Sequence, residues 1–194
     1  MRKQFLLFLF IAITLTAWSQ DFPALKPTDK KKLLASGIMI PLPTWLPEGF
    51  KLDTFEIKTS KSIPVQDKML YVQYTKKVND STWQSFMIEA GFEPDLESIW
   101  HNPEILQSPI GQIGFYYQPY EQTSDGKKKK QEDMISTEWV EINKVAFHVF
   151  CIVTMPGGQF EALGDEDEGE HKYQYKAISK GDFKKILQSL QVLK

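Results

Sequence analysis

Arginine is nearly absent from this 194-residue chain, because Arg2 is its only copy. Proteins that hold phosphate or carboxylate groups through paired hydrogen bonds normally use arginine, and nucleic-acid-binding proteins usually carry a basic stripe. The formal net charge is also slightly negative, −2 at pH 7. We therefore expect no nucleic-acid partner.

Cysteine is equally scarce, since Cys151 is the only one. A single thiol cannot form an internal disulfide, so we expect the stability of the fold to come from packing. Cys151 lies in the most apolar part of the chain that follows the N-terminal run, where a small buried hydrophobe is the favoured interpretation. A catalytic thiol would need a nearby base and some exposure to solvent.

Recognised motifs of catalysis and metal binding are missing as well. The three histidines, His101, His148 and His171, stand in no HExxH, HxH or Cys/His ligand spacing, and there is no Gly-x-Ser-x-Gly or phosphate loop. We predict no metal site, no cofactor and no assignable catalytic residue. An enzyme is thus the less favoured class of protein.

One long hydrophobic run is present, at the N-terminus. A charged start precedes the apolar segment Phe5–Leu15, and small residues follow at Ala17 and Ser19. This order is typical of a secretory signal peptide, and the run is short for a membrane span. We expect residues 1–19 to be a signal peptide that is cleaved before Gln20. A retained N-terminal anchor is the less favoured alternative.

Cleavage would leave a chain of one-domain size. It removes Arg2 and Lys3, so 21 of the 23 basic residues would remain against 25 acidic ones, with a net charge of −4. No cysteine stands at the cleavage point to carry a lipid. We expect a periplasmic or secreted protein without a stable membrane anchor after cleavage.

The segment around which the rest of the chain is organised is Val145–Thr154, the most apolar ten residues after the N-terminal run. Both of its alternating faces are apolar, which is typical of a strand in the middle of a sheet that is covered on both sides. Asn143 and Lys144 precede it and can form a tight hairpin, because asparagine tolerates positive φ. With this turn, His148 falls opposite Trp139.

The remaining patterns predict shorter elements on either side of this hairpin. Thr28 can cap a short helix through Ser36 that Gly37 ends, and Pro94–Trp100 can form another. Ser179 and Asp182 can cap a closing helix with one apolar stripe. We expect further strands at Phe50–Lys58, Lys68–Lys76, Trp83–Ala90, Gly111–Gln118 and Lys172–Ile178.

Two motifs at the ends of the domain resemble a known family. The segment Leu46–Leu52 (LPEGFKL) leads into a strand, and Lys185–Leu190 (KILQSL) closes the chain. They are similar to the opening and the closing helix of uncharacterised extracytoplasmic domains, such as those at the C-termini of some bacterial anti-sigma factors. The resemblance implies short antiparallel strands that end on a helix, and it carries no catalytic residue.

Together these patterns predict an α+β fold in a single domain. We expect one antiparallel sheet of about six or seven strands, a C-terminal helix that covers it and a short N-terminal helix. The expected division of the chain is a signal peptide at 1–19, a lead-in with the short helix at 20–45 and the α+β domain at 46–194.

Aromatic residues supply the candidate ligand site. On a strand, aromatic residues more often belong to the core or cover an edge, but those with polar tips can also line a binding groove. For His148, a packed and hydrogen-bonded strand histidine is favoured over a general base. The candidate ligand-binding residues are Trp100, Phe115, Tyr117, Tyr120, Trp139 and His148.

Two charged segments are expected to be solvated loops. Glu161–Glu170 and His171 contain many ligand-type side chains, but their spacing lacks the alternate acids and distal glutamate of a calcium loop, so weak divalent binding is only the alternative. Lys127–Lys130 lies within the polar loop Glu121–Asp133, and binding to anionic lipid is its alternative role.

The sequence favours an exported, non-catalytic envelope protein that binds a small ligand or another envelope protein. A hydrolase or transferase with an unrecognised site around one of the histidines is the second hypothesis. A histidine and a carboxylate within hydrogen-bond reach in one concave pocket would favour the enzyme.

Overall fold

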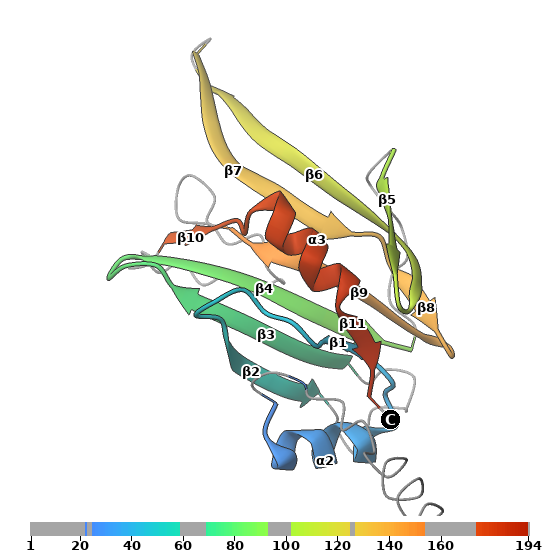
Figure 1. The fold of residues 1–194 in the computed structure, drawn as a ribbon. Helices are drawn as coiled ribbons and strands as arrows, with labels where there is room; N and C mark the ends of the chain where they lie inside the picture. Colours follow the sequence, from blue (N-terminus) through green and yellow to red (C-terminus); the bar gives the residue numbers. More distant parts are fainter. Residues whose placement is uncertain are drawn as a thin grey trace, which may run out of the picture.

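The computed structural model describes residue 22 and residues 25–58, 69–92, 102–124, 127–153 and 174–193 (Figure 1). This part of the chain is mostly sheet, with two helices and eleven strands. The helices are α2 (Pro27–Ser36) and α3 (Lys180–Gln188). The strands are β1 (Pro41–Pro43), β2 (Lys51–Lys58), β3 (Met69–Lys77), β4 (Thr82–Gly91), β5 (Glu104–Ser108), β6 (Gly111–Ser124), β7 (Lys127–Thr137), β8 (Val140–Ile142), β9 (Val145–Ile152), β10 (Gln174–Lys176) and β11 (Leu190–Val192).

The strands form two sheets rather than the single sheet of six or seven strands that we expected. The large sheet has nine strands, in the order β2-β3-β4-β9-β7-β6-β5, with β8 paired to β9 and β10 paired to β4. β1 and β11 form a second, two-stranded antiparallel sheet. The β4–β10 pair is parallel, whereas the other pairs of described strands are antiparallel. Very short strands such as β1, β8 and β10 explain the difference in number, because three residues give little periodicity to read.

Strand β9 lies in the interior of the large sheet, as its two apolar faces predicted. It pairs with β4 along one edge, and with β8 and part of β7 along the other. The predicted turn before it is confirmed, since Asn143 has φ 53° and Lys144 has φ 69°. Positive φ at both central residues is the signature of a type I′ hairpin turn, which matches the twist of the flanking strands.

One face of the large sheet carries the hydrophobic core, and we call it the core face. Its fully buried residues alternate along the central strands, with Leu70, Val72 and Tyr74 on β3, Phe86, Ile88 and Ala90 on β4, and Phe147 and Val149 on β9. From α3, Phe183 joins the same core, with its ring 6.3 Å from that of Phe115 on β6. Each such large apolar side chain contributes about 1.5–3 kcal/mol when it is fully buried.

Helix α3 begins where the sequence predicted. The Ser179 hydroxyl accepts a hydrogen bond from the backbone N–H of Asp182 at 3.1 Å, which is an N-cap contact. Its buried residues Phe183, Ile186 and Leu187 form the predicted apolar stripe. The fourth residue of that stripe, Leu190, lies beyond the helix as the first residue of β11.

Helix α2 is confirmed, but its first turn differs from the prediction. The residue at the N-cap position is Lys26, not Thr28, and Pro27 occupies the first turn. Proline suits this position because its missing N–H would have no partner there and its φ is already helical. At the other end, Gly37 adopts a left-handed φ of 76° and ends the helix as expected.

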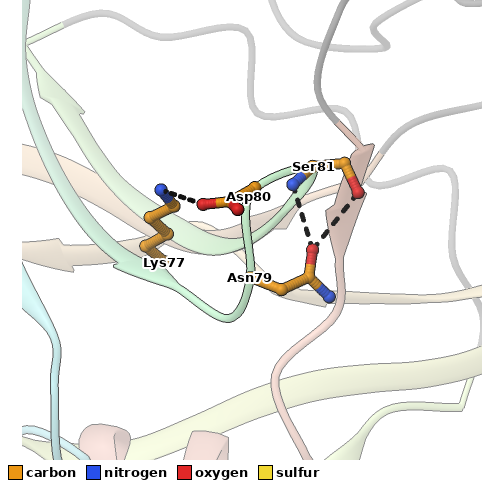
Figure 2. A network of polar contacts seen from close by, with 4 residues as sticks. All are labelled: Lys77, Asn79, Asp80 and Ser81. Atoms are coloured by element: carbon orange, nitrogen blue, oxygen red, sulfur yellow. Dashed lines mark hydrogen bonds and ion pairs between the residues drawn. The ribbon is translucent and has the colours of Figure 1, made fainter.

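The predicted hairpin between β3 and β4 is stabilised by a small polar network (Figure 2). The Asn79 side-chain oxygen accepts hydrogen bonds from the backbone N–H and the hydroxyl of Ser81, at 3.0 and 3.2 Å. The Lys77 ammonium lies 2.8 Å from an Asp80 carboxylate oxygen, and this hydrogen bond holds the pKa of Asp80 below its usual value. An asparagine that bonds the backbone two residues ahead mimics a turn, so this sequence is suited to a reversal.

The prediction of a polar loop at Glu121–Asp133 is wrong. β6 runs to Ser124, β7 starts at Lys127, and the two strands pair along this stretch, with Glu121 opposite Lys130. Asp125-Gly126 between the strands is a hairpin signal in the sequence. The charged run therefore belongs to a ribbon of two strands.

Several predictions fall on residues that lie outside the described ones. They are the signal peptide at 1–19, the helix Pro94–Trp100, His101, the acidic segment Glu161–Glu170 and His171. The expected lead-in at 20–45 is partly described, and it contributes Phe22, Leu33, Ile38, Ile40 and Leu42 to the core. Its strand β1 also pairs with β11 at the end of the chain.

Tyr74 provides a first test of the core. Its ring stacks on Phe86 at 4.9 Å, and its buried hydroxyl has no hydrogen-bond partner among the described residues. A buried hydroxyl without a partner costs about 1–3 kcal/mol. We expect Tyr74→Phe to keep the stacked ring and raise the free energy of unfolding in urea by about 1 kcal/mol. A loss of stability would show that this hydroxyl has a partner.

Candidate functional site

The structure does not bring the predicted ligand-binding residues into one groove. Phe115 is fully buried on the core face, against Phe183 of α3, and the half-buried ring of Tyr117 lies 5.4 Å from the Lys180 ammonium. Trp139 and His148 lie together on the opposite face of the sheet, which we call the outer face. Trp100 and the side chain of Tyr120 are outside what the structure describes.

A row of polar side chains crosses the outer face over four neighbouring strands. In the strand register, Glu56 of β2 is opposite Tyr71 of β3, Tyr71 is opposite Glu89 of β4, and Glu89 is opposite His148 of β9. Residues that are directly opposite project from the same face and interact. The neighbours of these residues along each strand, such as Leu70, Ile88 and Phe147, project into the core. We call these four residues the polar row.

His148 is held by contacts on three sides. Its Nε2 lies 3.0 Å from a carboxylate oxygen of Glu89. Its ring stacks on Trp139 with the centroids 4.0 Å apart and the planes at 22°, and it meets the ring of Phe150 at 4.7 Å. The His148 side chain is 19% exposed and that of Glu89 is 10% exposed. The stacking on Trp139 confirms the pairing that the hairpin predicted.

Tyr71 extends the row from the other side of Glu89. It is directly opposite Glu89 in the register of β3 and β4. Burial raises the pKa of Tyr71 above its usual value, and the negative charges of Glu89 and Glu56 raise it further. The Lys58 ammonium lies 4.8 Å from the centre of the Tyr71 ring, in the geometry of a cation–π contact. Glu89 thus lies between a tyrosine on one side and a histidine on the other.

This arrangement has two chemical uses. A carboxylate that fixes one nitrogen of a histidine sets the tautomer and orientation of the ring, and it leaves the second nitrogen for another partner. None of the described residues bonds Nδ1 of His148. The aromatic rings of Trp139 and Phe150 add flat apolar surface beside these polar groups. Ligand sites usually combine apolar rings with a few fixed polar groups in this way.

Glu89 and Tyr71 were missed by sequence reasoning. Their contacts with His148 depend on the register of β4 with β3 and β9, and Glu89 is 59 residues away from His148 in the chain. One signal was available. Glu89 is the only charged residue in the ten residues of β4, and an isolated charge in an otherwise uncharged strand usually has a partner.

Cys151 belongs to the core rather than to a site. It is 7% exposed, and burial raises the pKa of its thiol to about 12. At neutral pH the thiol is therefore protonated and is not a nucleophile. This agrees with the small buried hydrophobe that the sequence favoured.

The reactivity of Cys151 gives a second prediction. We expect the folded protein at pH 8 to react with a thiol reagent such as Ellman's reagent at least about 100-fold more slowly than the protein unfolded in urea. Since this is the only cysteine, the absorbance change reports this residue alone. Rapid labelling of the folded protein would mean that the thiol is open to solvent.

The described residues contain no group of three or more histidine, cysteine, aspartate or glutamate side chains placed to hold a metal ion. Neither helix in the described part of the chain has both the length and the hydropathy of a membrane span. Comparison with known proteins gives no match to a family model, a curated protein or a solved structure.

Proposed function

We propose that this protein is an exported, non-catalytic binding module of the cell envelope. Its ligand, a small molecule or another envelope protein, contacts the outer face at Trp139 and His148. The observation that carries the proposal is the stack of Trp139 on His148 beside the Glu89 carboxylate. It places a flat aromatic surface and fixed polar groups together on the same face of the sheet.

The signal-like N-terminus supports export to the periplasm or the medium, as does the resemblance to extracytoplasmic domains. The closing helix α3 is proposed to cover the core face, where Phe183, Ile186 and Leu187 are buried. That arrangement leaves the outer face as the side of the large sheet on which a partner binds.

Binding is favoured over catalysis because His148 is held in place. Its Nε2 is engaged by Glu89, and Trp139 and Phe150 pack against its ring. A general base must reach a proton of the substrate within hydrogen-bond distance, in a site from which water is excluded. A hollow lined by described residues lies elsewhere, beside Trp45. The contacts of His148 therefore fit recognition better than proton transfer.

An enzymatic function, as a hydrolase or transferase, is the second candidate, and one observation favours it. The 3.0 Å contact between Glu89 and His148 resembles the base and orienting carboxylate of hydrolytic triads. In that case Nδ1 would act on the substrate and Glu89 would hold the ring. Tyr71, which is opposite Glu89 in the sheet, would help to keep Glu89 in position.

Native mass spectrometry of the protein recovered from the exported fraction of its host separates the two candidates. The wild type is compared with His148→Gln, and Lys144→Gln in the exposed turn is the matched control. For a binder, we expect an extra mass on the wild type and the control, and at least about tenfold less of it on His148→Gln. A ligand group left without its hydrogen-bond partner costs about 1–3 kcal/mol, and about 1.4 kcal/mol corresponds to a tenfold loss of affinity. For an enzyme, the inactive variant would accumulate its substrate and carry more extra mass than the wild type.

A bound mass that is equal on all three proteins would contradict a role of His148 in either function. Circular dichroism of His148→Gln must match the wild type for the comparison to count. If His148→Gln does not fold, Trp139→Phe replaces it, because this change keeps an aromatic ring at the stack and removes the indole N–H.

A further inference from the structure

A second surface feature lies away from the polar row, at the C-terminal end of α3. Trp45, Lys185, Gln188 and Ser189 line an open hollow there. Trp45 precedes the turn that leads into β2, and the other three residues come from α3 and the residue after it. The hollow thus joins two segments that are about 140 residues apart in the sequence.

Hydrogen bonds fix the backbone of Trp45 against the end of α3. The backbone N–H and the hydroxyl of Thr44 both donate to the carbonyl oxygen of Ser189, at 3.0 and 2.8 Å. The Ser189 hydroxyl lies 3.3 Å from the carbonyl oxygen of Trp45. Pairing of Pro43 with Leu190 continues this contact into the β1–β11 sheet. The backbone segment that carries Trp45 is therefore held in position before any ligand binds, which reduces the entropic cost of binding.

The indole of Trp45 is 37% exposed although it is a large hydrophobic side chain. Three of the four residues that line the hollow carry hydrogen-bonding side chains, and one supplies an aromatic ring. A ligand that fits this lining must therefore have a flat apolar patch and several hydroxyl or carbonyl groups around it.

The charge beside the hollow is positive. The Lys185 ammonium lies 5.5 Å from the centre of the Trp45 ring, and its side chain is 63% exposed. Its acidic neighbour in the helix, Asp182, is 3.9 Å away, at the outer limit of an ion pair. Lys180 and Lys184 on the same helix both pair with Glu104 instead. Lys185 is therefore available to a carboxylate brought by a ligand.

We propose that this hollow binds an acidic saccharide, with one pyranose ring stacked on Trp45. A pyranose has a flat face of C–H groups that matches an aromatic ring, and its hydroxyls can bond the carboxamide of Gln188. The ligand carboxylate pairs with Lys185, whose flexible side chain swings away from the ring. This site is separate from the outer face and does not depend on the function proposed for it.

The test uses glucuronic acid as the probe, with glucose and glutamate as comparisons. Binding to the purified protein is followed by saturation-transfer nuclear magnetic resonance and by titration of the tryptophan fluorescence. We expect saturable binding of glucuronic acid with a Kd of about 1 mM, typical of a single exposed subsite. The binding of glucose is expected to be at least about fivefold weaker. Glutamate has the charge but no ring, and we expect it not to saturate.

Variants assign the binding to residues. Trp45→Ala should abolish binding of glucuronic acid, and Lys185→Met should bring its affinity down to that of glucose while leaving the affinity for glucose unchanged. Lys144→Met in the exposed turn before β9 is the matched control, because it removes a lysine away from the hollow, and it should bind as the wild type does. If Trp45→Ala fails to fold, Gln188→Ala on the exposed side of α3 replaces it, and we expect weaker binding of both sugars.

The outcomes that overturn the proposal are distinct. Absence of saturable binding of glucuronic acid would exclude an acidic saccharide. Equal binding of glutamate would show that the hollow selects an acidic group of any kind, such as that of an acidic peptide. Loss of sugar binding in Trp139→Phe but not in Trp45→Ala would move the site to the outer face. Competition by a second copy of the chain at high protein concentration would show that the hollow is a dimer contact.

Discussion

Replacing Phe183 with alanine is expected to lower the free energy of unfolding by about 3–5 kcal/mol. Phe183 is fully buried, and its ring meets Phe115 at 6.3 Å, so the change removes a large apolar side chain and leaves a cavity between α3 and the sheet. Native domains are stable by only about 5–15 kcal/mol, so the variant is expected to be close to unfolding at 37 °C.

Unfolding in urea at 25 °C measures this effect. Gln188→Ala is the matched control, since it also removes side-chain atoms from α3 but at an exposed position, and a change within about 0.5 kcal/mol is expected. A loss below about 1 kcal/mol for Phe183→Ala would show that α3 does not close the core, and the proposed cover of the core face would be withdrawn.

Val149→Asp is expected to abolish folding. Val149 is fully buried in β9, and its backbone N–H donates to the Thr137 hydroxyl at 2.9 Å. An aspartate here would be buried without an opposite charge, which costs several kcal/mol and approaches or exceeds the whole stability of a domain. The variant should therefore show the circular dichroism and the poorly dispersed nuclear magnetic resonance spectrum of an unfolded chain.

Lys144→Asp in the exposed turn before β9 is the control, because it introduces the same side chain five residues before the buried site, outside the core. Lys144 has a positive φ, which aspartate tolerates better than most residues. We expect this variant to fold with nearly unchanged stability. A folded Val149→Asp protein with a cooperative transition close to that of the wild type would contradict the interior position of β9.

The parts of the fold that could be predicted depend on contacts between near neighbours in the sequence. The Asn143-Lys144 turn fixes the pairing of β8 with β9, and it therefore places Trp139 against His148 from sequence alone. The Ser179 cap is likewise local, because it involves residues three positions apart. Such signals depend on a few residues that are close in sequence, so they can be read without knowledge of the long-range contacts.

The parts that were missed depend on long-range pairing or on unusual composition. The partners of Glu89 follow from the order of strands in the sheet, which no local pattern gives. Pro41–Pro43 forms a strand although proline cannot donate to a ladder, and this is tolerated because β1 pairs with β11 alone. In β7, a run of four lysines resembled a solvated loop, but this run is a strand that pairs with β6 across the ribbon.

The candidate site was predicted only in part for the same reason. Aromatic residues on strands can be recognised in the sequence, but which face of the sheet each one occupies depends on the register of several strands. Phe115 and Tyr117 therefore lie on the core face, whereas Trp139 and His148 lie on the outer face. Trp45 was not predicted as a site residue, because only the fold brings it to the end of α3.

The measurement that tests the central claim most directly is the native mass of the protein recovered from the exported fraction of its host. The account predicts a chain that begins at Gln20 and carries a reproducible extra mass, which tandem mass spectrometry assigns to a ligand or a partner protein. Absence of the chain from the exported fraction would contradict export, and an exported chain that carries no extra mass would contradict a binding module.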